Sequence, residues 1–67
     1  MEVTLNNQKI TIEENEVLET VLRTHNLFSK KGIAVAINTS VVPKSNWQNH
    51  KLNTNDIIMV ITATAGG

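Results

Sequence analysis

MEVTLNNQKITIEENEVLETVLRTHN, residues 1–26, is the stretch that decides the fold, because the spacing of its apolar residues changes part-way along. Its first twelve residues alternate between apolar and polar side chains on either side of Asn6-Asn7, an amide pair that tolerates the positive φ of a tight turn. Two alternating runs around a short turn predict a β-hairpin. From Val17 to Leu22 the apolar residues fall at helical spacing, which predicts an amphipathic helix.

The predicted helix is bounded by two asparagines. We expect Asn15 to cap its N-terminus and Asn26 to end it in a left-handed conformation, so that the helix spans about three turns. Acidic residues precede the helix and occupy its first turns, where the macrodipole favours negative charge. These residues are Glu13, Glu14, Glu16 and Glu19. A solvated helix start explains their carboxylates better than a pair for acid–base catalysis.

Three further strands are predicted after the helix. Residues 33–37 alternate between branched side chains and alanine, Val41-Val42 runs into Pro43, and residues 57–62 are mostly apolar. Pro43 ends the middle strand because proline cannot donate to a strand ladder. A helix between a hairpin and a following strand can cover one face of a mixed sheet, and the last strand can then lie beside the first. The sequence therefore predicts an α+β fold of the β-grasp type, a mixed sheet of four to five strands with one main helix on one face.

The core of this domain is predicted from the inward-facing positions of its elements. It contains Val3, Leu5, Ile10, Ile12, Val17, Leu18, Val21, Leu22, Val35, Ile37, Ile58 and Val60. Trp47 is expected to pack over the end of this core. The orientation of the last strand is open, because Ile57, Met59 and Ile61 are apolar too and could face inward instead. With Ile58 and Val60 taken as inward, Met59 and Ile61 lie on the open face of the sheet, where apolar side chains suggest a surface for docking a partner protein.

Length and composition allow one small domain. The chain has 67 residues, of which 40% are hydrophobic and 18% are charged, and its formal net charge is +0. This composition is too apolar for a disordered tail and too polar for a membrane span, and it lacks the basic surplus of a duplex nucleic-acid binder. Residues 1–12 lack the continuous apolar run of a signal peptide, so we expect a cytoplasmic protein.

Few side chains suggest catalysis or metal binding. The sequence contains no cysteine, which excludes a disulfide, a zinc knuckle and a thiol nucleophile. His25 and His50 lack further ligands at a metal-site spacing, so we predict no metal site and expect His25 to serve the end of the helix. Lys30-Lys31-Gly32 lacks the spacing of a phosphate-binding P-loop, so this chain is not expected to bind ATP by that motif.

The end of the sequence carries the strongest functional signal. Residues 63–67 follow the last predicted strand, so we assign residues 1–62 to the β-grasp domain and 63–67 to a flexible C-terminal tail. Gly66 and Gly67 have no Cβ and can enter a channel too narrow for other residues. We expect the other tail residues to bind a partner through backbone hydrogen bonds and apolar contacts; they are Ala63, Thr64 and Ala65.

The predicted reacting group is the α-carboxylate of Gly67. A terminal carboxylate is ionised at neutral pH and is a poor electrophile, so it needs activation before a nucleophile can attack it. Acyl-adenylation by an enzyme that binds ATP is the direct route to that activation.

Several short pieces of the chain match a known family in their order and spacing. They are Ala34-Val35-Ala36-Ile37-Asn38, Val41-Val42-Pro43, Trp47, Asp56-Ile57-Ile58 and Ala65-Gly66-Gly67. With them the sequence resembles, over essentially its whole length, the ThiS sulfur carrier proteins of thiamine biosynthesis, which are ubiquitin-like β-grasp proteins. Two positions depart from the family, because Glu16 stands where serine or threonine is usual and Asn55 where glycine is usual. Both departures concern local structure, since asparagine is the common substitute for glycine at positive φ.

The resemblance implies a function in which partner enzymes do the chemistry. A ThiF-type adenylating enzyme would bind the carrier and use ATP and magnesium to convert the Gly67 carboxylate into an acyl-adenylate. Sulfur from a cysteine desulfurase, in some systems through a rhodanese-like relay, would displace AMP and leave a Gly67 thiocarboxylate. The carrier would then dock on a thiazole synthase of the ThiG type and deliver sulfur to the thiazole ring. The chain itself would be a protein co-substrate that binds no cofactor, not an enzyme.

Two other functions stay open at this point. A neighbouring carrier, such as the small subunit of molybdopterin synthase, would use the same tail chemistry with a different acceptor. A stand-alone ubiquitin-like binding module would work without Gly66 and Gly67, whereas a modifier would be joined through them to lysines.

Overall fold

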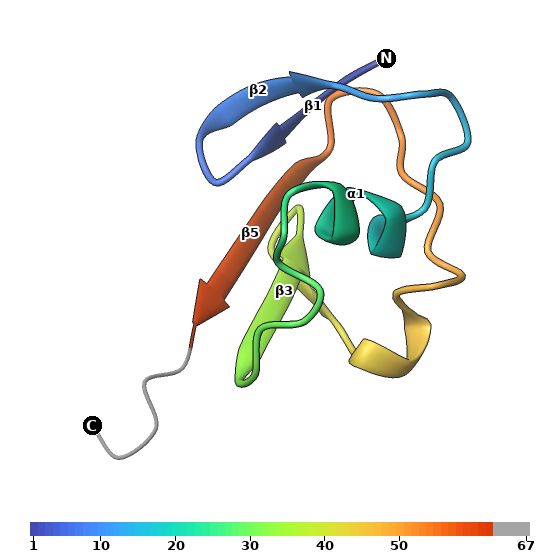
Figure 1. Ribbon diagram of the computed structural model, residues 1–67. Helices are drawn as coiled ribbons and strands as arrows, with labels where there is room; N and C mark the ends of the chain where they lie inside the picture. Colours follow the sequence, from blue (N-terminus) through green and yellow to red (C-terminus); the bar gives the residue numbers. More distant parts are fainter. Residues whose placement is uncertain (63–67) are drawn as a thin grey trace.

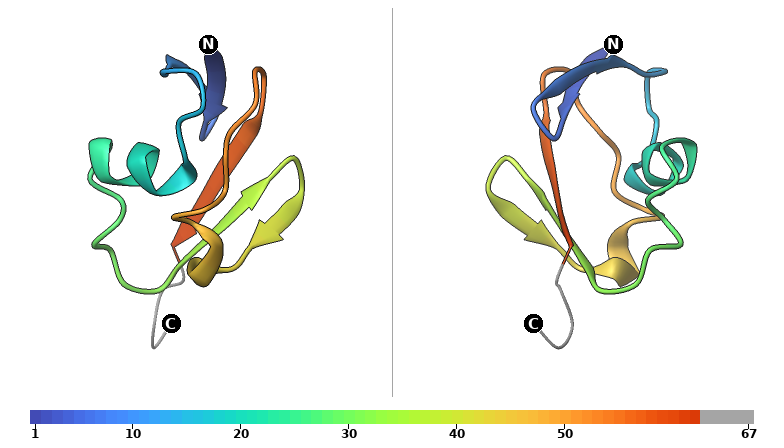
Figure 2. Two further views of the ribbon diagram at one scale, coloured as in Figure 1. Left: turned by 90° about the vertical axis from the view of Figure 1, so that its right-hand side faces the viewer. Right: turned by 60° about the vertical axis from the view of Figure 1, so that its left-hand side comes forward.

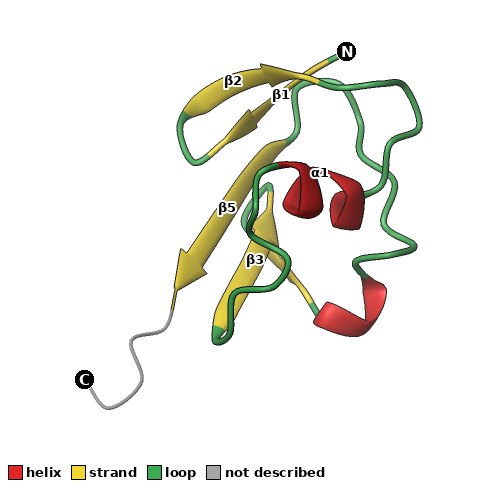
Figure 3. Ribbon diagram, viewed as in Figure 1, coloured by secondary structure: helices red, strands yellow, loops and turns green. Residues whose placement is uncertain are grey.

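The structure of the chain is a computed structural model that describes residues 1–62. Over this range the chain forms five strands, one α-helix and one 3₁₀ turn (Figures 1 and 3). In chain order the elements are β1 (Glu2–Leu5), β2 (Gln8–Thr11), α1 (Leu18–Thr24), β3 (Ile33–Ile37), β4 (Ser40–Val42), η1 (Lys44–Asn46) and β5 (Ile57–Thr62). Every predicted strand is present, and the last strand has the predicted bounds.

The described strands form one mixed sheet in the order β2-β1-β5-β3-β4. β1 and β5 are parallel neighbours, with Thr4 opposite Ile57, and each other neighbouring pair is antiparallel. The last strand therefore lies beside the first, at the centre of the sheet. α1 lies over one face of the sheet, and no element within residues 1–62 covers the other face (Figure 2). This arrangement confirms the predicted β-grasp fold.

The turn of the first hairpin follows from its two asparagines. Asn6 and Asn7 have φ values of 48° and 69°, the pair of positive angles that a type I′ hairpin turn requires. The Asn6 side chain also fixes the hairpin against the centre of the sheet, because its Oδ1 accepts a hydrogen bond from the Val60 N–H at 2.8 Å. The predicted turn is confirmed, and it also anchors β5.

α1 is shorter than predicted. It spans seven residues, about two turns, where three turns were expected. Asn15 is not the N-cap, because Val17 occupies that position and Asn15 turns the chain two residues earlier with a φ of 65°. Asn26 does end the helix as predicted, in a left-handed conformation with a φ of 60°.

A distant segment caps the first turn of α1. The Leu18 N–H donates to the His50 carbonyl at 2.9 Å, and the Glu19 N–H donates to the Trp47 carbonyl at 3.0 Å. These carbonyls accept hydrogen bonds from amide groups that have no partner within the helix. In most helices a side chain at the N-cap position does this. The helix therefore begins where residues 47–50 contact it, and no local sequence signal marks that position.

The core lies between α1 and the sheet. The buried hydrophobic residues are Val3, Leu5, Ile12, Leu18, Val21, Leu22, Val35, Ile37, Val42, Trp47, Leu52 and Ile58. Trp47 packs at the end of the core as predicted, and its indole Nε1–H donates to the Val42 carbonyl at 2.9 Å. Val42 and Leu52 are additional members, since Val42 continues the inward row opposite Val35 and the Leu52 N–H donates to the Glu16 carbonyl beside α1.

Three predicted core residues are only half-buried, and their positions explain why. Ile10 is on β2, which has a neighbour on one side only. Val17 precedes the first turn of α1. Val60 lies beyond the end of β1, which reaches only as far as Ile58 in the register with β5.

Candidate functional site

Exposed apolar side chains gather on the side of the sheet that α1 leaves uncovered. We call this surface the open face; it consists of Ala34, Ala36, Val41, Ile57, Met59 and Ile61. Directly opposed residues in neighbouring strands place their side chains on the same face. Ala36 lies opposite Met59 on one side and opposite Val41 on the other, and Ala34 lies opposite Ile61. The open face is therefore one continuous apolar surface across three strands.

The side-chain orientation of β5 agrees with the prediction. Ile58 is completely buried and Val60 packs against the core, whereas Met59 and Ile61 are 38% and 57% exposed. Ile57 lies on the open face as well. Only Met59 and Ile61 were predicted to lie on this face, although Ile57 lies on the same side of the strand. Val41, at 72% exposure, was also missed, since its place opposite Ala36 depends on the register of two strands.

A hydrogen-bonded pair fixes where β5 begins and which residues face outward. Asp56 is buried, and its Oδ1 accepts from the Asn38 Nδ2 at 2.9 Å. Its Oδ2 accepts from the Asn53 N–H at 2.8 Å, while the Asn38 Oδ1 accepts from the Ile57 N–H at 2.9 Å. Both carboxylate oxygens have partners inside the chain, so Asp56 holds β5 in register.

β5 leads directly into the predicted tail. Its last residue, Thr62, lies opposite Ile33, the first residue of β3. Ala63, Thr64, Ala65, Gly66 and Gly67 lie outside the described residues. Their predicted role as a flexible reactive tail stays a prediction, as does the division of the chain at residue 62.

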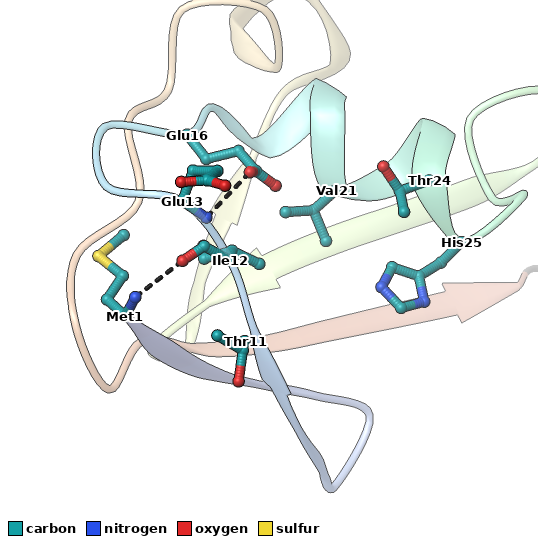
Figure 4. Close-up of a pocket in the computed structure, with 8 residues that line it drawn as sticks. All are labelled: Met1, Thr11, Ile12, Glu13, Glu16, Val21, Thr24 and His25. Carbon is teal, nitrogen blue, oxygen red and sulfur yellow. Dashed lines mark hydrogen bonds between the residues drawn. The ribbon is translucent and has the colours of Figure 1, made fainter.

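A cavity among the described residues lies at the other end of the molecule (Figure 4). It has a volume of about 470 Å³ and lies between the end of β2 and α1, where the Met1 ammonium group donates to the Ile12 carbonyl at 2.7 Å. His25 faces this cavity from the end of α1, and Glu13 and Glu16 lie on its rim. It is remote from Thr62 and contains none of the predicted site residues.

Two classes of feature are not found within residues 1–62. No three histidine, cysteine, aspartate or glutamate side chains in this range gather closely enough to hold a metal ion. No helix in the same range has the length and apolar character needed to cross a lipid bilayer.

The sequence of the chain matches a known protein family, and its fold matches solved structures. The family model for the ThiS family matches residues 1–67. The chain belongs to the ThiS family. No curated protein matches its sequence.

Solved structures of low sequence identity share the fold. The crystal structure of the thiamine biosynthesis protein ThiS from Geobacter metallireducens matches with a TM-score of 0.85 and 17% identity, over 100% of both chains. The NMR solution structure of a Geobacter metallireducens thiamine biosynthesis protein matches with a TM-score of 0.72 and 17% identity, over 100% of this chain and 88% of the other. The crystal structure of Sulfolobus solfataricus Urm1 matches with a TM-score of 0.55 and 24% identity, over 94% and 100% of the two chains.

Membership of the ThiS family identifies the chain as a ubiquitin-like protein of the sulfur-carrier class, whose partners are sulfur-transfer enzymes. Within that class, the structure describes a sheet whose central strand presents apolar residues outward and ends at Thr62, five residues before Gly67 in the sequence.

Proposed function

We propose that this ThiS-family chain is a sulfur carrier for thiazole formation in thiamine biosynthesis, with the Gly67 carboxylate as the site of sulfur attachment. The observation that carries the proposal is the continuity of β5. The same strand presents Met59 and Ile61 on the open face and leads, after Thr62, into the Gly-Gly end. An enzyme that docks on the open face is thereby close to the residues that it must modify.

The chemistry requires activation of the carboxylate by a partner. In a ThiF-type adenylating enzyme, a Gly67 carboxylate oxygen attacks the α-phosphorus of ATP, and pyrophosphate leaves. ATP and magnesium are the enzyme's ligands in this scheme. A sulfur nucleophile from a cysteine desulfurase or a rhodanese-like relay then attacks the acyl carbon, and AMP leaves. Where that nucleophile is a persulfide, a thiol reduces the sulfur–sulfur bond and releases the thiocarboxylate.

The thiocarboxylate is the form that gives up its sulfur. Its sulfur is a nucleophile attached to an acyl group and attacks a carbonyl carbon of the thiazole precursor bound by thiazole synthase. The sulfur stays with the precursor, and the acyl carbon takes an oxygen atom from the displaced carbonyl group or from water, which regenerates the carboxylate. The carrier is thus consumed and regenerated as a protein co-substrate. It contributes a docking surface and one reactive carboxyl group.

Apolar contact is the main recognition that the open face offers. Its six members are all uncharged, and the alanines between the larger side chains keep the surface low enough for a partner to approach β3 and β5. Complete burial of a side chain such as Met59 or Ile61 contributes about 1.5–3 kcal/mol. A few such contacts support the transient binding that a carrier needs in order to visit several enzymes.

Intact-mass measurement tests this function. The chain is incubated with the ThiF-type enzyme of the same genome, ATP and a sulfur donor. We expect the mass to rise by the difference between one sulfur and one oxygen atom, with the change confined to the C-terminal peptide. A chain that lacks Gly67 is the matched control and should show no increase. An unchanged mass in the intact chain would contradict the proposal.

The acceptor is tested separately. Mixing the purified thiocarboxylate with thiazole synthase and its other substrates should yield the thiazole and return the carrier to its original mass. Turnover with molybdopterin synthase instead would assign the chain to the neighbouring pathway.

A further inference from the structure

The charges of this neutral chain are segregated along its sequence. No aspartate or glutamate occurs between Glu19 and Asp56. Five of the six lysine and arginine residues lie in that interval: Arg23, Lys30, Lys31, Lys44 and Lys51, with Lys9 as the sixth. A net charge of +0 therefore conceals a long basic segment.

The fold gathers three of these lysines around one cavity. The loop before β3 supplies Lys30 and Lys31, and η1 supplies Lys44; we call these three residues the lysine cluster. They line a cavity of about 440 Å³. All three are exposed. Within residues 1–62 none of them forms a salt bridge, since the salt bridge in this range joins Arg23 and Glu19.

Packed aromatic rings form the wall of this cavity. Phe28 and Trp47 both line it, and their rings meet edge to face with centroids 6.3 Å apart. The Arg23 guanidinium lies over the Phe28 ring, 3.9 Å from its centroid, and also pairs with Glu19. Arg23 is thus engaged within the chain. The residues of the lysine cluster are exposed to solvent beside the packed rings of Phe28 and Trp47.

The lysine cluster lies at the end of the molecule from which the tail continues. Ile33, which follows the loop of Lys30 and Lys31, is directly opposite Thr62. Ile61 of the open face lies opposite Ala34, one residue further along β3. Both views in Figure 2 place this loop and η1 at the end of the molecule where β5 finishes. The lysine cluster therefore lies at the same end of the sheet as Thr62, the last described residue.

Two of the six acidic residues lie at the opposite end. Glu13 and Glu16 are beside Met1 and the end of β2, on the rim of the other cavity (Figure 4). The exposed lysines near Thr62 are thus separated in space from Glu13 and Glu16. Such a charge distribution orients a protein during diffusional encounter and raises its association rate.

We propose that the lysine cluster docks on a carboxylate-rich surface of the enzyme that activates the tail, beside the entrance through which residues 63–67 reach its active site. This inference rests on the proposed function and adds a second, electrostatic contact to it. Three exposed ammonium groups on flexible stems, with no buried polar group among them, suit a broad acidic surface better than a small anion. Lysine acts there as a hydrated point charge that attracts at a distance.

Steady-state kinetics of thiocarboxylate formation test the lysine cluster. The triple variant Lys30→Glu/Lys31→Glu/Lys44→Glu should raise the KM for the carrier about tenfold, with kcat unchanged, because charge complementarity affects encounter. The triple variant with arginine at the same positions should keep the wild-type KM. Raising the ionic strength from about 0.05 M to about 0.5 M should bring the wild-type and glutamate variants to similar KM values, since salt screens exposed charges.

Single substitutions provide a matched control for total charge. Lys31→Glu and Lys51→Glu change the net charge equally, and Lys51 lies outside the cluster, where its backbone pairs with Val17. Only Lys31→Glu should raise KM. Circular dichroism of each variant checks that the fold is intact. If the glutamate triple variant does not fold, the neutral triple variant Lys30→Gln/Lys31→Gln/Lys44→Gln carries the test, because it should raise KM whereas the arginine triple variant should not.

The outcomes separate this inference from the proposed function. If the wild-type chain forms no thiocarboxylate, the proposed function fails and the inference fails with it. If the wild-type chain is charged but the glutamate and glutamine triple variants keep its KM and salt dependence, only the lysine cluster is refuted. Equal effects of Lys31→Glu and Lys51→Glu would also refute it, because net charge rather than position would then control binding. Saturable binding of inorganic pyrophosphate to the free chain, removed by Lys44→Gln, would overturn it in favour of a small-anion site.

Discussion

Ile58 and Met59 are adjacent on β5, yet one is completely buried beneath α1 and the other is 38% exposed on the open face. Both are large apolar residues on the central strand of the sheet. The buried face holds the fold together, whereas the open face can lose apolar groups with little effect on stability. The comparison separates the residues that make the domain from those available to a partner.

The largest expected effect comes from truncating the two neighbours in turn. Ile58→Ala should lower the free energy of unfolding by about 2–5 kcal/mol, because it leaves a cavity in a packed core. Met59→Ala should change it by no more than about 0.5 kcal/mol. Urea denaturation followed by Trp47 fluorescence measures both values. Similar losses for the two variants would show that the two faces of β5 do not differ in the way the structure describes.

A smaller loss of stability is expected at the junction that sets the orientation of β5. Asp56→Asn replaces one carboxylate oxygen with an NH2 group. This group then faces a donor, either the Asn53 N–H or the Asn38 Nδ2, so one partly buried hydrogen bond is lost. We expect a cost of about 1–3 kcal/mol, measured by the same denaturation. The isosteric Asn53→Asp is a suitable control, since Asn53 takes part through its backbone N–H. Equal stability of Asp56→Asn and the wild type would exclude a structural role for this carboxylate.

The smallest effect in free energy is expected in docking. Met59→Asp or Ile61→Asp should weaken binding to the adenylating enzyme about tenfold, or 1.4 kcal/mol, and leave the far-ultraviolet circular dichroism unchanged. Titration calorimetry with the adenylating enzyme provides the measurement. Thr20→Asp is the matched control, because Thr20 is exposed on α1, which lies on the other side of the sheet. Wild-type affinity in both aspartate variants would remove the open face from the proposed function.

Local patterns were enough to predict the strands and the first turn, where Asn6-Asn7 takes the positive φ angles of a tight turn because its side chains tolerate them. Residues 57–61 are apolar at every position, so alternation could not fix the orientation of β5, and it is the burial of Ile58 that confirms the choice made. The resemblance to the ThiS family likewise depended on short pieces that can be read along the chain, and the family match confirms it.

Features that depend on distant contacts were not predictable in this way. The start of α1 was misplaced because its amide groups are capped by the carbonyls of His50 and Trp47, about thirty residues away in the sequence. Val41 and Leu52 were assigned neither to the open face nor to the core, since their positions require the register of β4 and the path of residues 47–52. The lysine cluster also combines a loop with η1, which only the tertiary structure brings together.

The capping of α1 by residues 47–50 has a consequence for how the molecule opens and closes. A helix of seven residues is too short to persist in water by itself. Its first turn donates hydrogen bonds to the carbonyls of a segment that contributes Trp47 to the core, so separating the two pieces leaves the helix amides and these carbonyls without partners. The two pieces therefore form one cooperative unit, and slow hydrogen exchange in α1 reports the integrity of the Trp47 segment. The open face, on the opposite side of the sheet, is therefore supported by α1 and residues 47–50 together, and it loses both supports in the same unfolding event.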